Sequence, residues 1–259
     1  MGSMVDFKNK INFVLSDIDD TMTDEGRLGS EAYQAMWDLH EAGVHVIPVT
    51  GRPAGWCEMI ARMWPVSGVV GENGGFYFRY HGQKMHRSFV FDAKTQSENR
   101  KKLDQLQDRI LREVPGSALA SDQFTRLMDL AIDFCEDVPR LPKTDVQKIV
   151  RLFEEVGAHA KVSSIHVNGW FGDYNKLSQS LHLLKTEFGL SPDEARKQAM
   201  FIGDSPNDEP MWEYFPHSFS VANISEFLPD LKFKPNYIAP SRGGRGFAEV
   251  ARLILKNRS

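Results

Sequence analysis

The sequence predicts an α/β protein with a doubly wound parallel sheet that is interrupted by a smaller inserted α+β domain. Over the first eighty residues, nearly continuous apolar runs alternate with amphipathic stretches, which is typical of parallel strands separated by helices. From about residue 82 the pattern changes to alternating polar and apolar positions, which indicate antiparallel strands. The first pattern returns after residue 171. We therefore expect a core domain of residues 4–81 and 172–259 with an inserted domain of residues 82–171.

The amino-terminal part is predicted to form a βαβαβ unit. Strands are expected in "INFVLS", in "VHVIPVT" and in "SGVVG", and helices over residues 30–43 and 53–63. Parallel strands joined in this way form right-handed crossovers, and ligands bind beyond the carboxyl ends of the strands. The side chains expected to face inward from the second helix are Trp56, Met59, Ile60 and Met63.

The inserted segment is predicted to place two helices on a small open sheet. A turn is expected at "YHGQ", a polar helix over about 93–114, and a strand at residues 127–134 that is solvated on one face. A further strand is expected in "AKVSSIHVNG". Beyond the insertion, a helix ends at Gly189, the capping box "SPDE" begins the next helix, and "AMFIGD" forms a core strand.

Composition favours a small-molecule partner in a reducing compartment. The chain has 259 residues and a net charge of -4, so duplex nucleic acid is a poor candidate for the partner. Its two cysteines, Cys57 and Cys135, lack metal or redox spacing and are expected to be buried thiols. No apolar run is long enough for a membrane span, and no signal peptide is recognised. We expect a cytoplasmic monomer or homodimer, with "MGSM" as a cloning remnant.

Carboxylates collect at the ends of two predicted core strands. Asp17 and Asp19 follow the first strand, and Asp204 and Asp208 follow "AMFIG". Either pattern alone is also typical of an ordinary turn. In a doubly wound sheet the two strand ends converge, and like charges about 4 Å apart repel by roughly 4 kcal/mol near a protein surface. A divalent cation removes that repulsion, and an all-oxygen ligand set favours Mg²⁺.

The order of four motifs identifies a resemblance to a known family. "DIDDT", "VTGRP", "DYNKL" and "GDSPND" occur in this order over nearly the whole chain. The chain thus resembles haloacid dehalogenase (HAD) superfamily phosphatases, whose core is Rossmann-like, and among them the class with the larger cap inserted after the third core strand. It is most similar to the branch that contains the Cof-type hydrolases and the sucrose-, trehalose- and mannosyl-3-phosphoglycerate phosphatases.

The resemblance implies a phosphomonoesterase that acts through an aspartyl phosphate. Asp17 is the implied nucleophile and Asp19 the implied general acid and base. The implied phosphate-binding residues are Thr50, Gly51, Arg52, Lys176 and Asn207. The implied Mg²⁺ ligands are Asp17, Asp19 through its backbone carbonyl, Asp204 and Asp208, the last either direct or through water. Asp20 has no implied role.

The inserted domain is expected to select the leaving group of the substrate. His166, Asn168 and Trp170 are candidates, because Asn and His bond sugar hydroxyls and an indole face packs on a pyranose ring; a structural role is at least as plausible for each. Weaker candidates are Arg126, Asp129 and Asp133. For the glycine-rich "PSRGGRG" (residues 240–246) a flexible surface turn is favoured over anion binding, and for Asn73 a positive φ angle over phosphate contact.

These observations favour hydrolysis of a small phosphorylated metabolite, with a sugar or glycosyl phosphate as the preferred substrate. A phosphomannomutase-like phosphomutase shares the cap class, but it needs more cationic residues in the cap than the predicted cap strands contain. A non-catalytic phosphate-binding module is the third alternative. Such a module would tolerate loss of Asp17 or Asp19, but this chain has both.

Overall fold

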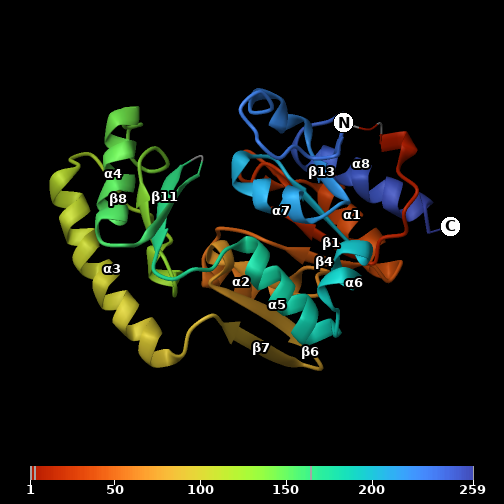
Figure 1. The fold of residues 1–259 in the computed structure, drawn as a ribbon, viewed down its shortest axis with the longest axis horizontal. Coiled ribbons are helices and arrows are strands. Elements are labelled where there is room, and N and C mark those ends of the chain that lie inside the picture. The colour runs from red at the N-terminus through yellow and green to blue at the C-terminus, as the bar shows by residue number, and fades with distance from the viewer. Residues whose placement is uncertain (1, 3, 164, 259) are drawn as a thin grey trace.

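One five-stranded parallel sheet is built from both ends of the chain. The computed structural model describes residues 2, 4–163 and 165–258, and Figure 1 shows the sheet within the lobe that also holds both termini. The strand order is β14-β13-β12-β1-β4, with every neighbouring pair parallel. The strands are β1 (Phe13–Ser16), β4 (His45–Pro48), β12 (Ala199–Gly203), β13 (Ser218–Ser220) and β14 (Tyr237–Ile238).

Helices cover both faces of this sheet, so the predicted doubly wound core is confirmed. Val14 of β1 belongs to the apolar cluster beneath α1, α2 and α8, whereas Phe13 and Leu15 belong to the cluster beneath α5, α6 and α7. This division follows from the alternation of side chains along a strand. The helices are α1 (Ser30–Glu41), α2 (Ala54–Met63), α5 (Lys176–Phe188), α6 (Pro192–Gln198), α7 (Glu209–Tyr214) and α8 (Gly243–Lys256).

A three-stranded antiparallel sheet extends the core toward the insertion. It consists of β5 (Val69–Gly71), β6 (Phe76–His81) and β7 (Lys84–Phe89). A parallel bridge between Val49 and Val70 joins it to the central sheet. The expected "YHGQ" turn connects β6 to β7, and Phe89 packs against the core. The hairpin therefore spans the boundary expected at residue 82.

The insertion is the predicted α+β domain, with two helices on an open sheet. Its strand order is β10-β11-β9-β8, and all neighbours are antiparallel. Apolar side chains of both helices pack with Leu130, Ile132 and Val167 on one face of the sheet. The elements are α3 (Ala93–Glu113), β8 (Ala118–Leu119), β9 (Leu130–Asp133), α4 (Lys143–Glu155), β10 (His159–Val162) and β11 (His166–Trp170).

Short elements complete the fold. A small hairpin follows Asp17–Thr21, and several single 3-10 turns lie in loops. These elements are β2 (Thr23–Asp24), β3 (Arg27–Leu28), η1 (Met4–Asp6), η2 (Glu72–Gly74), η3 (Gln123–Thr125), η4 (Pro206–Asp208) and η5 (Ala222–Glu226). Among the described residues, no helix has both the length and the apolar character that a membrane crossing needs.

The inward face predicted for α2 is wrong at three of four positions. Only Ile60 is buried, whereas Trp56, Met59 and Met63 are 41%, 40% and 68% exposed. The buried face instead contains Ala54, Cys57, Ile60 and Ala61. These mostly small side chains let the helix lie close to the sheet, which leaves the larger ones outside.

The strand expected at residues 127–134 is not solvated on one face. All four residues of β9 are buried, because α3 and α4 cover Leu130 and Ile132 and the opposite face, with Ala131 and Asp133, is turned toward the core lobe beside His166 and Asn168. Its buried carboxylate, Asp133, is compensated locally. It accepts hydrogen bonds from the backbone N–H groups of Cys135 at 2.8 Å, Glu136 at 2.7 Å and Asp137 at 2.8 Å.

Two further expectations need correction. The "PSRGGRG" segment is not a flexible turn, because Gly243 begins α8 and Gly244 N–H donates to Asp24 Oδ2 at 3.2 Å. Gly243 has a φ of +47°, and a Cβ there would overlap the Asp24 carboxylate, so glycine is required. Cys57 is buried as expected, whereas Cys135 is only partly buried.

Candidate active site

Two neighbouring strands of the central sheet deliver carboxylates to the same edge. β1 and β12 pair in register, with Ser16 opposite Ile202. Asp17 continues this pairing, since its N–H donates to Ile202 O at 3.0 Å, and Asp204 directly follows β12. The parallel sheet thus brings together two acidic residues that are 187 positions apart in the sequence.

A third carboxylate completes an acidic triad at this edge. Carboxylate oxygens of Asp17, Asp204 and Asp208 lie within 4.8 Å of one another. Asp208 is fully buried at the end of η4, and its Oδ2 accepts the N–H of Asp204 at 3.1 Å. Gly203 makes this approach possible, because a Cβ at that position would overlap the Asp208 carboxylate.

One lysine bridges two members of the triad. Lys176 Nζ donates to Asp17 Oδ1 at 2.6 Å and to Asp208 Oδ1 at 3.1 Å. Lys176 is the first residue of α5, where Asn175 acts as N-cap and accepts the N–H of Ser178 at 2.9 Å. Burial alone lowers the pKa of Lys176, but the Asp17 and Asp208 carboxylates more than offset this and raise the pKa.

The triad carries more negative charge than the single lysine balances. Burial raises the pKa of Asp17, Lys176 opposes the shift, and Asp208 and Asp19 add to it, with a result of about 7. Burial, then Asp17 and Asp208, raise the pKa of Asp204 to about 9. A divalent cation would hold these groups as carboxylates, and three carboxylates with no Cys or His fit Mg²⁺.

The loop after β4 brings Thr50, Gly51 and Arg52 to the site. Thr50 is fully buried, and its Oγ1 accepts the N–H of Arg52 at 3.0 Å, which leaves its hydroxyl proton free for a phosphate oxygen. The Arg52 guanidinium donates to both carboxylate oxygens of Asp19, from Nη2 to Oδ1 at 2.7 Å and from Nε to Oδ2 at 3.0 Å and Oδ1 at 3.1 Å. It lies 4.3 Å from the Trp56 ring centre. Arg52 therefore engages the Asp19 side chain outside the acidic triad.

A cavity of about 540 Å³ lies between the two lobes above the triad. Thr50 and Asp208 are fully buried behind its wall, and Trp170 lines a smaller neighbouring cavity. The sequence-predicted residues that line the main cavity are Asp17, Asp19, Gly51, Arg52, Lys176, Asp204, Asn207, His166 and Asn168.

The three candidates from the insertion share one face of β11 but differ in their surroundings. Asn168 Nδ2 donates to Asp129 Oδ2 at 3.0 Å. His166 Nε2 lies 2.8 Å from Glu136 Oε2, without the geometry of a hydrogen bond. Trp170 is only 3% exposed and stacks on Tyr174, with ring centres 5.7 Å apart, which favours its structural role over packing on a sugar ring.

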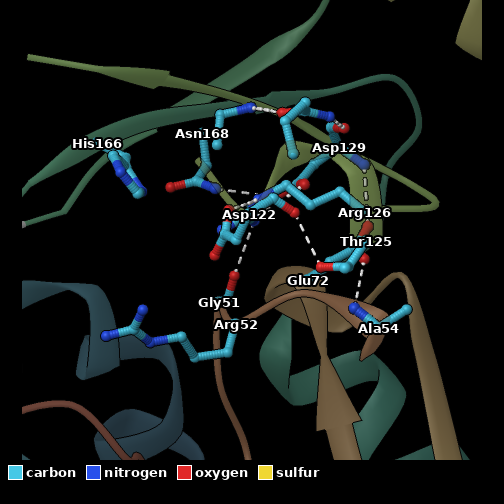
Figure 2. Close-up of polar contacts among 12 residues, drawn as sticks. Gly51, Arg52, Ala54, Glu72, Asp122, Thr125, Arg126, Asp129, His166 and Asn168 are labelled. Carbon is cyan, nitrogen blue, oxygen red and sulfur yellow. Dashed lines mark hydrogen bonds and ion pairs between the residues drawn. The ribbon is translucent and has the colours of Figure 1, made fainter. Parts of the chain in front are cut away.

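Arg126 joins the insertion to the loop after β4. Its Nη1 donates to Gly51 O at 3.1 Å and to both oxygens of Asp129 at 3.1 Å, and its Nε donates to Asp122 Oδ1 at 2.9 Å. Figure 2 shows Arg126 between these acidic residues and Gly51. Since Gly51 O and Arg52 N–H belong to one peptide unit, Arg126 helps to orient an N–H of the predicted phosphate-binding loop.

A buried carboxylate makes the reciprocal connection from core to insertion. Glu72 accepts the backbone N–H groups of Ala54 at 2.9 Å, Leu127 at 3.0 Å and Asp129 at 3.1 Å, and also that of Met128. Burial and then Asp129 raise the pKa of Glu72 to about 7, while Arg126 and the N–H groups of Leu127 and Met128 lower it. Glu72 thus fixes the 127–129 segment against the start of α2 (Figure 2).

Replacing Glu72 with leucine is expected to lower the free energy of unfolding by about 3 kcal/mol, because several buried N–H donors lose their acceptor. Urea denaturation monitored by circular dichroism measures this loss. Glu58→Leu is the matched control: Glu58 forms partly exposed ion pairs with Arg62 and Arg87, so its loss should change stability by no more than about 1 kcal/mol. Equal effects of the two substitutions would contradict the role of Glu72.

Sequence reasoning treated several cavity residues as weak candidates or omitted them. Lys161 lines the cavity but had no predicted role, and Arg242, which also lines it, belongs to the "PSRGGRG" segment, for which a surface turn was favoured over anion binding. Asp20 also lines it; its φ is 58°, and its backbone oxygen accepts Asn223 Nδ2 at 2.8 Å. Asn73 has the positive φ predicted for it, 57°.

Comparison with known proteins agrees with this fold. A family model described as haloacid dehalogenase-like hydrolase matches residues 14–118. A phosphoglycolate phosphatase from Methanothermobacter thermautotrophicus is 30% identical over 241 residues, which are 92% of this chain and 96% of that protein. A phosphoglycolate phosphatase from Methanospirillum hungatei is 27% identical over 250 residues, 93% of this chain and 96% of that protein.

Solved structures show the same fold at low sequence identity. A Thermoplasma acidophilum protein superposes with a TM-score of 0.75 at 18% identity, over 95% of this chain and 99% of that one. The sucrose-phosphatase from Synechocystis, solved with sucrose and phosphate, gives a TM-score of 0.64 at 19% identity, over 95% and 98% of the two chains. The chain belongs to the haloacid dehalogenase-like hydrolases and is an enzyme of their phosphatase type.

Proposed function

We propose that this phosphatase is a Mg²⁺-dependent phosphomonoesterase that hydrolyses a small phosphorylated metabolite through an aspartyl-phosphate intermediate. The observation that carries the proposal is the acidic triad of Asp17, Asp204 and Asp208 around Lys176, at the floor of the cavity. We also propose a cytoplasmic location, because a chain with only two cysteines that lack the spacing of a disulfide framework is typical of a reducing compartment.

Asp17, Asp204, Asp208 and the backbone carbonyl of Asp19 are the proposed Mg²⁺ ligands. A bound Mg²⁺ supplies positive charge that offsets the carboxylates and the phosphoryl oxygens. Lys176 adds a second positive charge in direct contact with Asp17 Oδ1. The Thr50 hydroxyl, the Gly51 N–H and the Asn207 side chain are proposed to bind the remaining phosphoryl oxygens, together with the Arg52 N–H once it exchanges its hydrogen bond to Thr50 Oγ1.

In the first step an Asp17 carboxylate oxygen attacks phosphorus, and the bond from phosphorus to the ester oxygen breaks. Asp19 gives its proton to the departing alkoxide, so that an alcohol leaves. In the second step Asp19 takes a proton from water, whose oxygen attacks the aspartyl phosphate. The Asp17–phosphorus bond breaks, inorganic phosphate is released, and Asp17 is again a carboxylate.

To act as the general acid, Asp19 must first give up its hydrogen bonds to Arg52. Its carboxylate is held by Arg52, and a general acid must face the ester oxygen instead. We propose that Arg52 yields this contact when the substrate fills the cavity, since both side chains line it.

Two classes of substrate fit this chemistry. The motifs favour a sugar or glycosyl phosphate, as in the sucrose-phosphatase of similar fold. The relatives named phosphoglycolate phosphatase instead favour a short phosphorylated acid. The buried position of Trp170 removes one argument for a sugar.

Phosphate release from a panel of sugar, polyol, nucleotide and carboxylic-acid phosphates, with and without Mg²⁺, tests the proposal. We expect turnover of at least one class, dependent on Mg²⁺. Mg²⁺ should also raise the melting temperature of the wild type, because a ligand that binds only the folded state stabilises it. In Asp204→Asn, which lacks a proposed ligand, Mg²⁺ should neither support turnover nor raise the melting temperature. Turnover by the wild type that does not depend on Mg²⁺ would refute the metal assignment.

A further inference from the structure

We propose that Lys161 determines substrate specificity by binding a second anionic group, a carboxylate, on the leaving group of the substrate. This inference rests on the proposed phosphatase function and refines its substrate class. The preferred substrate is then a short phosphorylated carboxylic acid rather than a neutral sugar phosphate.

The cap sheet presents Lys161 to the cavity. Lys161 on β10 is paired directly with Asn168 on β11, so the two side chains lie on the same face of the sheet. Both line the main cavity, opposite the face on which α3 and α4 pack. Lys161 therefore approaches the site from the lobe that faces the leaving group.

Lys161 is the cation in the cavity wall that has no carboxylate partner, among the residues that the structure describes. Its Nζ has one hydrogen-bond acceptor, the backbone oxygen of Asn207 at 3.5 Å. The other four cations of the wall each form an ion pair: Arg52 with Asp19, Arg126 with Asp122 and Asp129, Lys176 with Asp17 and Asp208, and Arg242 with Glu226.

A partly buried ammonium that forms no ion pair favours an anionic ligand. Burial and then repulsion by Lys176 lower the pKa of Lys161, while the Asp208 and Glu209 carboxylates oppose the shift. An anion beside Lys161 would offset both effects. Neutral sugar hydroxyls would leave this charge unpaired, whereas a carboxylate would pair with it.

The place of Lys161 also limits the size of the substrate. Lys161 and Lys176 both line the main cavity and the small cavity next to it, together with Asn207. Because Lys176 contacts the proposed nucleophile, the second anionic group must lie close to the phosphoryl group. A two- or three-carbon phosphorylated acid meets this condition.

A matched pair of substrates tests the proposal. Phosphoglycolate and ethyl phosphate differ in the carboxylate, and kcat/KM is measured for both with the wild type, Lys161→Met and Lys161→Arg. We expect Lys161→Met to lower kcat/KM for phosphoglycolate about 10- to 100-fold, the range for a lost charged hydrogen bond, and that for ethyl phosphate less than about 3-fold. Lys161→Arg should restore part of the preference for phosphoglycolate over ethyl phosphate.

Lys143→Met is the matched control, since it removes one positive charge from an exposed position at the start of α4. This variant should leave kcat/KM unchanged for both substrates. If Lys161→Met lowered kcat/KM equally for both substrates, or for neither, the proposal would be overturned. A wild type that hydrolyses only esters with uncharged leaving groups would overturn it as well. In those cases the phosphatase function still stands, whereas a wild type that hydrolyses no ester refutes that function itself.

Discussion

Replacing Asp17 with asparagine is expected to lower kcat by at least about 10⁴-fold with every substrate that the wild type hydrolyses. The amide is a poor nucleophile, so the covalent route through the aspartyl phosphate is closed. Steady-state phosphate release measures the loss. In rapid-quench experiments with ³²P-labelled substrate, the wild type should incorporate label into the protein and Asp17→Asn should not.

A stability measurement separates chemistry from folding in this variant. Asp17→Asn loses the ion pair with Lys176, but it also removes one charge from the repelling triad, so its melting temperature should stay close to that of the wild type. Asp193→Asn, at an exposed position in the first turn of α6, is the control for a neutralised aspartate and should retain full activity. Labelled protein from Asp17→Asn would assign the nucleophile to another residue.

Replacing Asp19 with asparagine is expected to lower kcat by about 10²- to 10⁴-fold, the usual contribution of a general acid or base. The loss should be largest for poor leaving groups such as alkyl phosphates and smallest for p-nitrophenyl phosphate. An alkoxide needs a proton to depart, whereas p-nitrophenolate does not. Comparing kcat for these two esters in both enzymes measures the difference.

Asp20→Asn is the matched control for Asp19, one residue further along the same loop. Asp20 has a left-handed backbone with φ of 58°, which asparagine also adopts readily, so the fold should be preserved. Activity within about 5-fold of the wild type is expected. If Asp20→Asn were as damaging as Asp19→Asn, the assignment of acid–base chemistry to Asp19 alone would be wrong.

The core of the fold follows directly from local patterns. Continuous β-branched and aliphatic runs such as "FVLS" and "AMFIG" identified buried parallel strands, and the helices between them set their order. Because ligands bind at the carboxyl ends of such strands, Asp17 and Asp204 were expected to converge, and their carboxylates do.

Helix faces were less predictable, because apolar content alone does not say which side is buried. In α2 the small residues Cys57 and Ala61 face the sheet and the large Trp56 and Met63 face outward. Close packing decides this, since a helix approaches a sheet most closely through small side chains. Trp170 is a related case, because His159 and Tyr174, whose rings stack on its indole, lie on other segments of the chain.

The motifs in the chain were sufficient to predict which groups gather at the strand ends: the aspartates, the threonine and the lysine of the proposed phosphoryl-transfer site are each next to the element that positions them. Partners that lie far apart in sequence depend on the tertiary structure. Glu72 meets the 127–129 segment, Arg126 meets Gly51, and Lys161 lies across the cavity from Asp17, only after the insertion has packed against the core. Whether a lysine is paired or left without a counter-ion depends on those long-range contacts, because charge balance is set by distance in space and not by distance along the chain.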